Sequence, residues 1–539
     1  MMEYEILGLD LLPIYIIFIP IVSSLILYLI HSRHAILVSV SCQMLLSAAC
    51  TFYFYRIFNM DMHIVSIGGW ARFAGVTLRN DHLSMSFAVM SVIIWWCVIV
   101  FAFYEKYSSN YLFFILFLEG TFMGLLMSND LFNLFVFIEI VTIISTMLIT
   151  FKKDGAALKA GFYYLIFNNA GMLFYLVAFI IIYSVCGTLN LQLIKTSIGP
   201  FKDNFSVRMA YVMITAAFGV KSAFFPVYTW LPKAHSAAPS AISALLSGLL
   251  VKSGLYEFIR LNEVFHYSSM DMPLAVLGSL TAFLGVLFAL CQNDIKLILA
   301  FSTVSQIGIM FMGIGPFKGF LYSGGLLHLM NHSLLKSLLF LGAGIIISEY
   351  KNKNVMQIRG VFARLPMTSI FMIIGMLSIT GMPYLNGYVG KSIVAYSLKK
   401  TPWELIVLQL VNIGTAASFI KLSQIFFINV KGVSMRRKKR ITENVPLLIL
   451  SIGCIVTAAF YIEMANLLVE VPVPDIIIIS PRKIGEYVLT MFAGFALYKL
   501  VLKHDPVWVK NIRHFDVSFA NACMFLVGFV VVMSAVIIQ

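Results

Sequence analysis

Charged residues are scarce in this sequence. Only 12% of its 539 residues are charged, whereas 60% are hydrophobic, and the mean hydropathy is +0.93. A soluble globule of this length needs a larger polar surface than this composition provides. The composition therefore excludes a soluble globular protein and is typical of a polytopic membrane protein.

Long polar segments are also missing. No polar stretch exceeds about 25 residues, so the chain has no room for a soluble catalytic domain. The net charge of +14 could suggest nucleic acid as a partner. However, the basic residues lie in short loops between apolar runs, as membrane orientation requires, and we expect no nucleic-acid binding.

Cysteine motifs are absent too. The seven cysteines show no CxxC spacing, and most of them fall inside apolar runs. Neither a disulfide framework nor iron–sulfur ligation is therefore supported. We expect no cofactor and no metal in this chain, and no redox centre of its own.

Long apolar runs are what the sequence has in abundance. The first, Leu11 to Ile30, follows Glu3, Glu5 and Asp10 instead of the basic segment of a signal peptide, so we expect it to remain as a membrane helix. About sixteen runs are long enough to span a bilayer. The sequence thus predicts an all-α polytopic membrane protein with about 14–16 transmembrane helices.

The loop charges predict an orientation. Lysine and arginine are more frequent in the loops that follow odd-numbered spans, and basic loops favour the cytoplasm, so both termini should face outside. The strongest contribution is the run RRKKR at Arg436 to Arg440. An alternative interpretation of this run is a patch for lipid headgroups or a partner.

Two lysines interrupt the apolar stretch from Val220 to Arg260. A lysine near the bilayer midplane costs about 2.5 to 3.5 kcal/mol, so Lys221 and Lys252 should line water or meet a partner. Three prolines between them cannot all sit in one unbroken helix, because proline lacks an N–H and clashes with the preceding turn. We therefore predict two membrane helices joined by a bent link around Pro226, Pro232 and Pro239. Transporters have such broken helices at their ion sites.

Glu139 lies near the middle of the predicted span SNDLFNLFVFIEIVTIISTMLI. A carboxylate at that depth is stabilised by a lysine within about 4–6 Å, and Lys221 is the natural partner. The alternative is a static ion pair that serves packing alone. Glu119, in the preceding span, is a second buried carboxylate for which the sequence suggests no partner.

A second broken helix is predicted at GMPYLNGYVGKSIVAYSL, where Pro383 and Gly387 precede Lys391. Lys391 follows Lys221 by 170 positions (391 − 221), and Lys421 follows Lys252 by 169 (421 − 252). Two lysine pairs with nearly equal offsets indicate a duplicated bundle. No acid stands 170 positions after Glu139, so any proton relay through the second unit must use other groups.

Between the two units, His328, His332 and Lys336 recur at every fourth position of HLMNHSLLKSLLFLGAGIII. They share one helical face and form a file roughly 12 Å long. A histidine titrates near neutral pH and can both accept and release a proton. The alternatives are a zinc site, for which HLMNH lacks the glutamate of HExxH, and histidines that serve packing.

These motifs resemble the antiporter-like subunits of respiratory complex I, energy-converting membrane-bound hydrogenases and Mrp cation/proton antiporters. The motif sequences look closest to those of the Mrp D-type subunit, and the resemblance runs from about residue 60 to 430. The matching segments are IGGW at 67–70, NDLFNLFVFIE at 129–139, VKSAFFPVYTWLPKAHSAAPSAISAL at 220–245, NDIKLILAFSTVSQIG at 293–308, HLMNHSLLKSLLFL at 328–341 and GMPYLNGYVGK at 381–391.

The resemblance implies a proton pathway. In it, Glu139 and Lys221 form the first-channel pair, the central axis follows, and Lys391 ends the second channel. The axis consists of Lys252, His328, His332 and Lys336. The resemblance also implies a core of fourteen helices with two inverted five-helix repeats, which the spans beyond residue 480 exceed. We expect N-terminal helices, a first repeat, a second repeat and C-terminal helices at 1–110, 111–260, 261–430 and 431–539.

The expected function is translocation of protons, or of protons coupled to sodium, by one member of a multisubunit complex in a prokaryotic plasma membrane. Its partners would be other membrane subunits and the lipid bilayer. The driving force would come from redox chemistry in other subunits. The alternatives are a subunit of an Mrp-type sodium/proton antiporter without a redox partner, and a channel or scaffold that does not pump.

Overall fold

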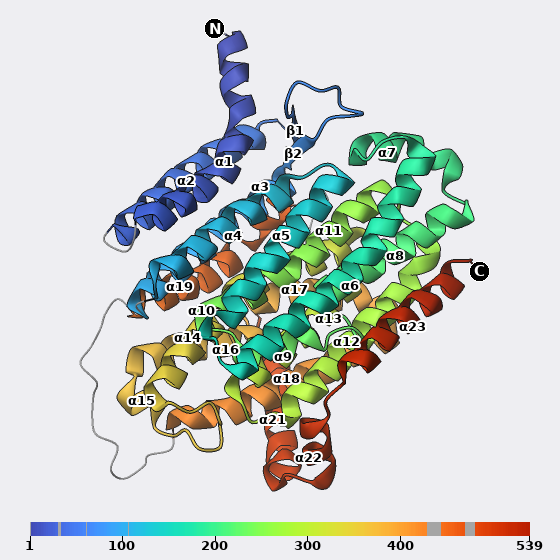
Figure 1. Ribbon diagram of the computed structural model, residues 1–539. Coiled ribbons are helices and arrows are strands. Elements are labelled where there is room, and N and C mark those ends of the chain that lie inside the picture. The colour runs from blue at the N-terminus through green and yellow to red at the C-terminus, as the bar shows by residue number, and fades with distance from the viewer. Residues whose placement is uncertain are drawn as a thin grey trace.

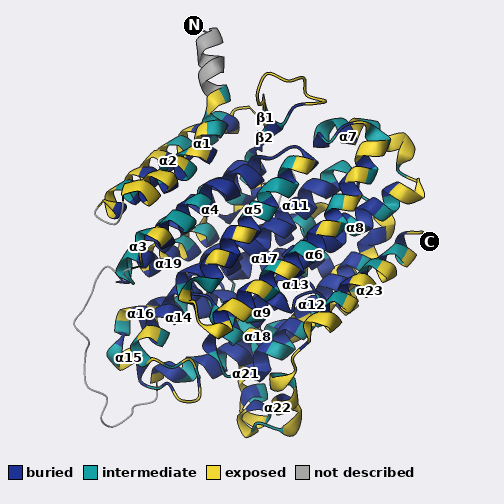
Figure 2. Ribbon diagram, viewed as in Figure 1, coloured by how far each residue is buried: buried dark blue, intermediate teal, exposed yellow. Residues whose placement is uncertain are grey.

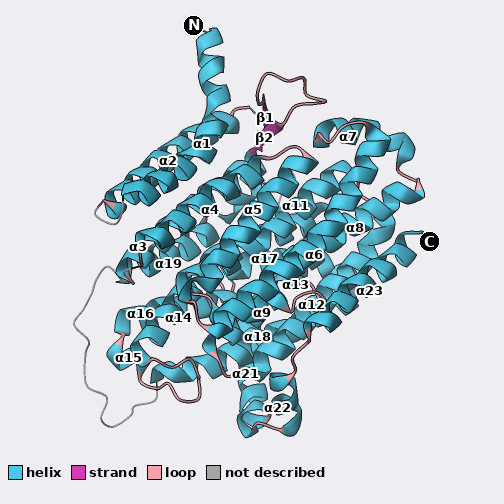
Figure 3. Ribbon diagram, in the orientation of Figure 1, coloured by secondary structure: helices cyan, strands magenta, loops and turns pink. Residues whose placement is uncertain are grey.

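The chain forms a bundle of long helices in the computed structural model, which describes residues 2–30, 34–60, 62–105, 107–427, 443–468 and 480–538 (Figures 1 and 3). A short antiparallel hairpin of β1 (Met62–Ser66) and β2 (Thr77–Asp81) lies at one end of the bundle, and α22 lies at the other end (Figure 1). The basic run Arg436 to Arg440 lies outside the described residues.

The helices of the first half are α1 (Met2–Ile30), α2 (Ala35–Phe58), α3 (His82–Tyr104), α4 (Ser109–Met127), α5 (Leu131–Ile149), α6 (Gly155–Cys186), α7 (Leu191–Ser197), α8 (Phe205–Lys221), α9 (Trp230–Ala237), α10 (Ser240–Leu245) and α11 (Val251–Val264). Those of the second half and the tail are α12 (Asp271–Cys291), α13 (Ile295–Ile314), α14 (Gly319–Tyr350), α15 (Val361–Arg364), α16 (Pro366–Thr380), α17 (Asn386–Ser397), α18 (Pro402–Phe427), α19 (Val445–Ala459), α20 (Tyr461–Leu468), α21 (Pro481–Leu500), α22 (Val507–His514) and α23 (Phe519–Ile538).

Thirteen of the described helices are long and apolar enough to cross a membrane, or fourteen if the bent pair α19 and α20 forms one span. The predicted fold class, an all-α polytopic membrane protein, is confirmed. Two of the predicted apolar runs correspond to shorter helices, α8 with 17 residues and α16 with 15 residues. Both are cut short where the sequence predicted a broken helix.

The first break follows Lys221, the last residue of α8. Ala223 has a φ of 56°, which a helix cannot accommodate, and Pro226 lies in the irregular link before α9. Pro232 is tolerated in the first turn of α9, and Pro239 is the N-cap of α10. Each proline therefore sits where its missing N–H costs no helical hydrogen bond.

The second break separates α16 from α17. Gly381 ends α16 with a φ of 85°, a left-handed conformation that glycine adopts without strain. Tyr384, with a φ of 77°, turns the chain again before α17 begins at Asn386. Lys391 is thereby placed one turn into a helix that starts inside the bundle.

The same local pairing occurs at opposite ends of the bundle. Asp130 caps α5 and bridges to Asn190, while Asp294 caps α13 and bridges to Asn354. Both members of the second bridge follow those of the first by 164 positions (294 − 130 and 354 − 190). This repetition agrees with a duplicated, inverted unit, although the exact limits of the repeats stay a prediction.

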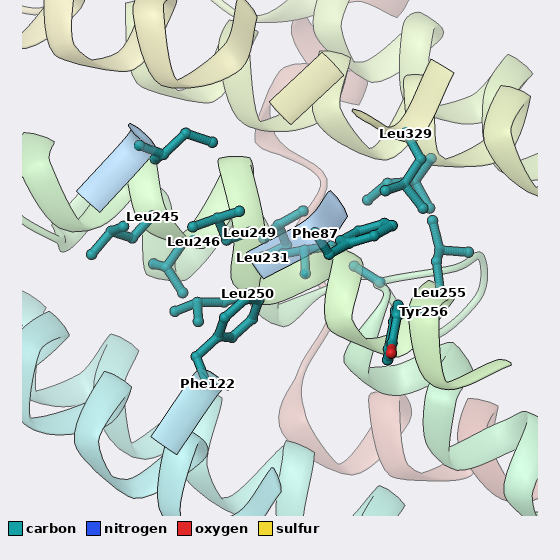
Figure 4. Packing of buried hydrophobic residues seen from close by; sticks show 14 of the residues in the cluster. Phe87, Phe122, Leu231, Leu245, Leu246, Leu249, Leu250, Leu255, Tyr256 and Leu329 are labelled. Carbon is teal, nitrogen blue, oxygen red and sulfur yellow. The ribbon is translucent and has the colours of Figure 1, made fainter. Parts of the chain in front are cut away.

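The centre of the molecule is apolar and tightly packed. Helices α10, α11, α13 and α14 are buried along nearly their whole length, whereas α1, α2 and α23 expose much of their surface (Figure 2). Leu245, Leu249 and Leu250 pack with Phe87 and Phe122 around the join of α10 and α11 (Figure 4). The charged side chains in this region are therefore surrounded by hydrocarbon.

An ionic cluster closes the β-hairpin end of the bundle. Arg260 of α11 donates to both carboxylate oxygens of Asp81 at 2.7 Å, and Arg79 pairs with Asp81 at 2.8 Å and with Glu263 at 2.7 Å. Burial alone would raise the pKa of Asp81, but the guanidinium groups of Arg260 and Arg79 hold it well below its usual range. The cluster ties the hairpin to α11.

We expect Asp81→Asn to lower the stability of the solubilised protein by about 3 kcal/mol, because it leaves the buried guanidinium of Arg260 without its bidentate partner. The measurement is the thermal unfolding midpoint in detergent. The matched control is Asp203→Asn. Asp203 pairs with Arg208, and the Asp203 side chain is 90% exposed. The control should cost less than about 1 kcal/mol. Equal effects of the two substitutions would contradict the stabilising role of the cluster.

Candidate functional site

Lys221 lies at the end of α8, where the break in the helix lets its ammonium group reach α5. The residue is only 3% exposed, and its Nζ donates to the Thr142 hydroxyl at 2.8 Å. The ring of Tyr164 lies 5.9 Å away and faces the same ammonium group. A hydroxyl and an aromatic face therefore solvate this buried lysine.

Glu139 lies one turn before Thr142 on α5, and the described atoms show no direct ion pair between Glu139 and Lys221. The carboxylate accepts a hydrogen bond of 3.3 Å from Asn169 when that amide turns its nitrogen toward it. It also lines a cavity of about 310 Å³ between α5 and α6, together with Asn169 and Leu173. Glu139 is thus near the predicted partner but faces a lateral opening.

Lys252 is held by the backbone of the helix that carries it. Residues 246–250 form a π-helical turn between α10 and α11, and such a turn leaves carbonyl groups without their usual partners. The Lys252 ammonium replaces the missing donors, because it donates to the carbonyls of Ser247 at 2.7 Å and Gly248 at 2.9 Å. The sequence indicated the buried lysine but not the π turn.

Helix α14 presents the predicted file of basic groups. Lys336 donates to the Leu299 carbonyl at 2.8 Å and to the Ser302 hydroxyl at 2.6 Å. His328 bonds to the Gln306 side chain at 3.0 Å, and neither ring nitrogen of His332 has a hydrogen-bond partner. The two imidazole centroids are 6.0 Å apart.

Lys391 ends the file in the second half of the molecule. It is 5% exposed, and its Nζ donates to the Ile379 carbonyl at 2.7 Å, near the end of α16. The adjacent Gly390 packs on α14 so closely that a Cβ there would lie 2.6 Å from the backbone of His328. Only glycine allows α17 to bring Lys391 this near to the histidines.

Close helix contacts join these groups into one series, which we call the lysine–histidine row: Lys221, Lys252, Lys336, His332, His328 and Lys391. At Gly254, α11 packs directly against the part of α8 that carries Lys221, and at Gly248 the π turn packs against Ser337 of α14. The described part of the row contains no carboxylate partner for Lys252, Lys336 or Lys391. Because like charges repel at short range, a proton held by one member disfavours a proton on the next.

Two further basic residues approach the row and were not singled out in the sequence. His235 of α9 is fully buried and stacks on Phe340 with centroids 4.6 Å apart, and Phe340 is also 6.0 Å from the Lys336 ammonium. Lys296 of α13 donates to the Ala238 carbonyl at 2.6 Å. Both residues lie in segments of the motifs quoted above, KAHSAAPS and NDIK. The spacing within those motifs did not show that His235 and Lys296 lie close to the row.

Glu119 of α4, which had no predicted partner, accepts a short hydrogen bond from Gln43 of α2. The remaining Glu119 oxygen has no hydrogen-bond partner, and the residue is fully buried. Within the described residues, no group of three or more His, Cys, Asp or Glu side chains is arranged to hold a metal ion.

Comparison with known proteins decides the family. Residues 128–420, more than half of the chain, match the family described as NADH:quinone oxidoreductase/Mrp antiporter, TM. The chain belongs to this family. The predicted resemblance is confirmed, and the matched range contains every member of the lysine–histidine row.

Two relatives of this antiporter-family chain are similar to it over more than half of its length. Hydrogenase-4 component B of Escherichia coli is 32% identical over 348 residues, which cover 59% of this chain and 50% of that protein. The chain thus spans about half the length of this relative. The D subunit of the Na(+)/H(+) antiporter of Alkalihalophilus pseudofirmus is 29% identical over 344 residues, which cover 62% of this chain and 69% of that protein.

Solved structures show the same fold. A chain of the archaeal membrane-bound sulfane sulfur reductase has a TM-score of 0.79 at 24% identity, covering 89% of this chain and 99% of that chain. A chain of the Mrp complex from Dietzia sp. DQ12-45-1b has a TM-score of 0.79 at 20% identity, covering 94% and 99%. A chain of respiratory complex I from Thermus thermophilus has a TM-score of 0.76 at 21% identity, covering 90% and 99%.

This antiporter-family chain is therefore a multi-pass membrane protein whose fold is shared by chains of complex I, of an Mrp complex and of the sulfane sulfur reductase. Transport roles stay predictions for Glu139, Lys221, Lys252, His328, His332, Lys336 and Lys391.

Proposed function

We propose that this chain carries protons, or protons coupled to sodium, within a membrane complex that is driven by redox chemistry in other subunits. The observation that carries the proposal is the lysine–histidine row, a series of buried basic groups linked by close helix contacts from Lys221 to Lys391. Buried ionisable groups are costly in a membrane, and they mark ion pathways and proton relays. A scaffold that does not transport ions has no use for six of them.

The proposed mechanism is electrostatic. When Glu139 approaches Lys221, the ammonium form of the lysine is stabilised, and when the two separate, the lysine releases its proton more easily. The structure has the separated arrangement, with Lys221 bonded to Thr142. A change of charge at Lys221 then alters the neighbours in turn, through Lys252 and the histidines to Lys391.

Redox coupling is the first choice because the hydrogenase-4 component and the sulfane sulfur reductase chain are both close in sequence or fold. The second candidate, a subunit of an Mrp-type sodium/proton antiporter, is favoured by the relatives among antiporter D subunits and by the Mrp complex chain. For either candidate we propose a prokaryotic plasma membrane with both termini outside, an orientation that rests on the loop charges.

Mass spectrometry of the gently solubilised complex separates the two candidates. Redox coupling predicts that flavin or iron–sulfur subunits co-purify with the chain in fixed stoichiometry. An assembly that contains only further membrane subunits, and that exchanges sodium for protons in vesicles without any electron donor, would overturn redox coupling in favour of the antiporter.

The switch assigned to Glu139 makes a specific prediction. Glu139→Gln removes the charge that stabilises the Lys221 ammonium, so proton transport should fall to a small fraction of the wild-type rate. Glu139→Asp keeps the charge and withdraws it by about one methylene, so partial transport should remain. Both variants are measured by proton uptake into vesicles at equal complex content.

The neighbouring Asn169 supplies the control. Asn169→Ala removes the hydrogen bond to Glu139 without changing charge, and it should reduce transport less than Glu139→Gln does. A purely structural role for Glu139 would give the reverse order of the two acid variants, with Gln tolerated and Asp worse. Wild-type transport by Glu139→Gln would likewise show that the switch is wrong.

A further inference from the structure

Glu257 of α11 is a buried carboxyl group that the lysine–histidine row does not include. It is 1% exposed, and neither of its side-chain oxygens has a hydrogen-bond partner. An isolated carboxylate in a low-dielectric interior is strongly disfavoured, so a group of this kind either remains protonated or exchanges its proton with a neighbour.

Glu257 is not needed as a counter-ion for Arg260, the cation one turn further along α11. Arg260 donates to both oxygens of Asp81, to Glu263 at 3.2 Å and to the Tyr256 hydroxyl at 2.8 Å. The pKa of Asp81 is held well below its usual range, so its negative charge is permanent under assay conditions. The charge of Arg260 is therefore already balanced.

The position of Glu257 on α11 connects two regions. Gly254, Glu257 and Arg260 follow one another at intervals of three residues and form one ridge on the helix surface. At Gly254 this ridge meets Lys221 and Ser222 of α8, where a Cβ would lie 3.0 Å from the Lys221 Cβ. Each interval advances about 4.5 Å along the axis, so Glu257 lies midway between Lys221 and the ionic cluster.

Proton-exchanging groups lie beside this ridge of α11. The Ser222 hydroxyl, next to Gly254 and one turn from Glu257, is fully buried and has no hydrogen-bond partner. Tyr175 of α6, with Tyr256 and Arg260 of α11, are the titratable groups in electrostatic contact with the carboxyl. Lys252 projects from α11 about 140° away, so Glu257 belongs to a branch separate from the row.

Solvent access increases along the same direction. Side-chain exposure is 5% at Arg260 and 11% at Asp81, and it reaches 21% at Glu263 and 20% at Arg79. The ionic cluster thus forms the boundary between the buried carboxyl and the water at the β-hairpin end. Glu263 is the carboxylate nearest to that water among the acids of the cluster.

We propose that Glu257 is a proton-carrying residue that connects Lys221 with the aqueous face at the β-hairpin end. This proposal rests on the function proposed above. In the transfer, the Lys221 ammonium becomes a neutral amine and the Glu257 carboxylate becomes a carboxylic acid, with the Ser222 hydroxyl accepting one proton while releasing another. The acid then gives its proton to Glu263 and returns to the carboxylate, and Glu263 releases the proton to water.

The test compares four single variants in the full assembled complex: Glu257→Gln, Glu257→Asp, Lys221→Ala and the control Glu404→Gln. Glu404 is also buried, at 4% exposure, and one of its oxygens has no hydrogen-bond partner, but it lies on α18, which packs mainly against α12 and α21. Proton uptake into vesicles is measured over a range of pH, after assembly is verified by native gel electrophoresis.

Glu257→Gln should slow proton uptake by about tenfold or more, since the amide cannot carry a proton, while Glu404→Gln keeps the wild-type rate. Glu257→Asp should restore much of the rate with a shifted pH profile, which a structural role would not produce. If Glu257→Gln assembles poorly, the Asp variant still decides, because an unshifted wild-type profile would contradict proton carriage. Normal uptake by Glu257→Gln with an inactive Lys221→Ala overturns this inference alone, whereas normal uptake by Lys221→Ala overturns the proposed function.

Discussion

Lys221→Ala is expected to abolish proton transport while the complex still assembles. The substitution removes the only ammonium group at the first break, and no other described basic side chain bonds to Thr142 in its place. Buried lysines of this kind tune their proton affinity through a nearby acid and through desolvation, and alanine can do neither. We expect proton uptake at background level in vesicles that contain normal amounts of the mutant complex.

Two variants separate loss of charge from loss of volume. Lys221→Met fills much of the same space without a charge and should be equally inactive, which excludes a cavity as the cause. Lys233→Ala is the matched control, because this lysine of the same stretch pairs with Asp516 at 2.8 Å, is partly exposed and lies outside the row. Transport by Lys221→Met near the wild-type rate would contradict the role of Lys221.

Lys391→Ala is expected to be as damaging as Lys221→Ala. Lys391 is the last basic group of the row, and its Nζ bonds to the carbonyl of Ile379 at the second break. Without it the row has no basic group at the second break to take a proton from the histidines of α14. Proton uptake should fall to background, measured in the same vesicle assay.

The control for Lys391 is Lys399→Ala, in the short turn that follows α17, where the lysine is exposed and lies over the ring of Tyr396 at 4.6 Å. It should leave transport unchanged. Full activity of Lys391→Ala would mean that the second half of the molecule is structural, and that protons leave the row before α17.

The C-terminal helices bind back onto the core. α21 packs on α18 at Gly494, Arg513 of α22 donates to the Cys291 carbonyl at 2.7 Å, and Arg208 of α8 donates to the Ile537 carbonyl at 3.1 Å. The sequence identified these spans as additional to the fourteen-helix core. Only the structure shows that they cover α8, α12 and α18, because their partners lie far earlier in the chain.

Several features followed from the sequence because they depend on local chemistry. Composition and run length determined the all-helical membrane fold, since a bilayer admits backbone only where its hydrogen bonds are satisfied within the segment. Proline and glycine placed the two breaks correctly, and the spacing of His328, His332 and Lys336 put them on one helical face. Motif resemblance then indicated the family.

Other features required the tertiary structure because they depend on contacts between distant segments. The bond from Lys221 to Thr142, the lateral cavity beside Glu139 and the partner of Glu119 all join separate helices. Glu257 shows the difference most clearly. In the sequence it is one acid near Arg260, and only packing reveals that Arg260 is already paired with Asp81, which leaves the carboxyl buried without a partner. Sequence determines which groups the membrane must tolerate, whereas side-chain geometry decides which of them remain able to exchange a proton.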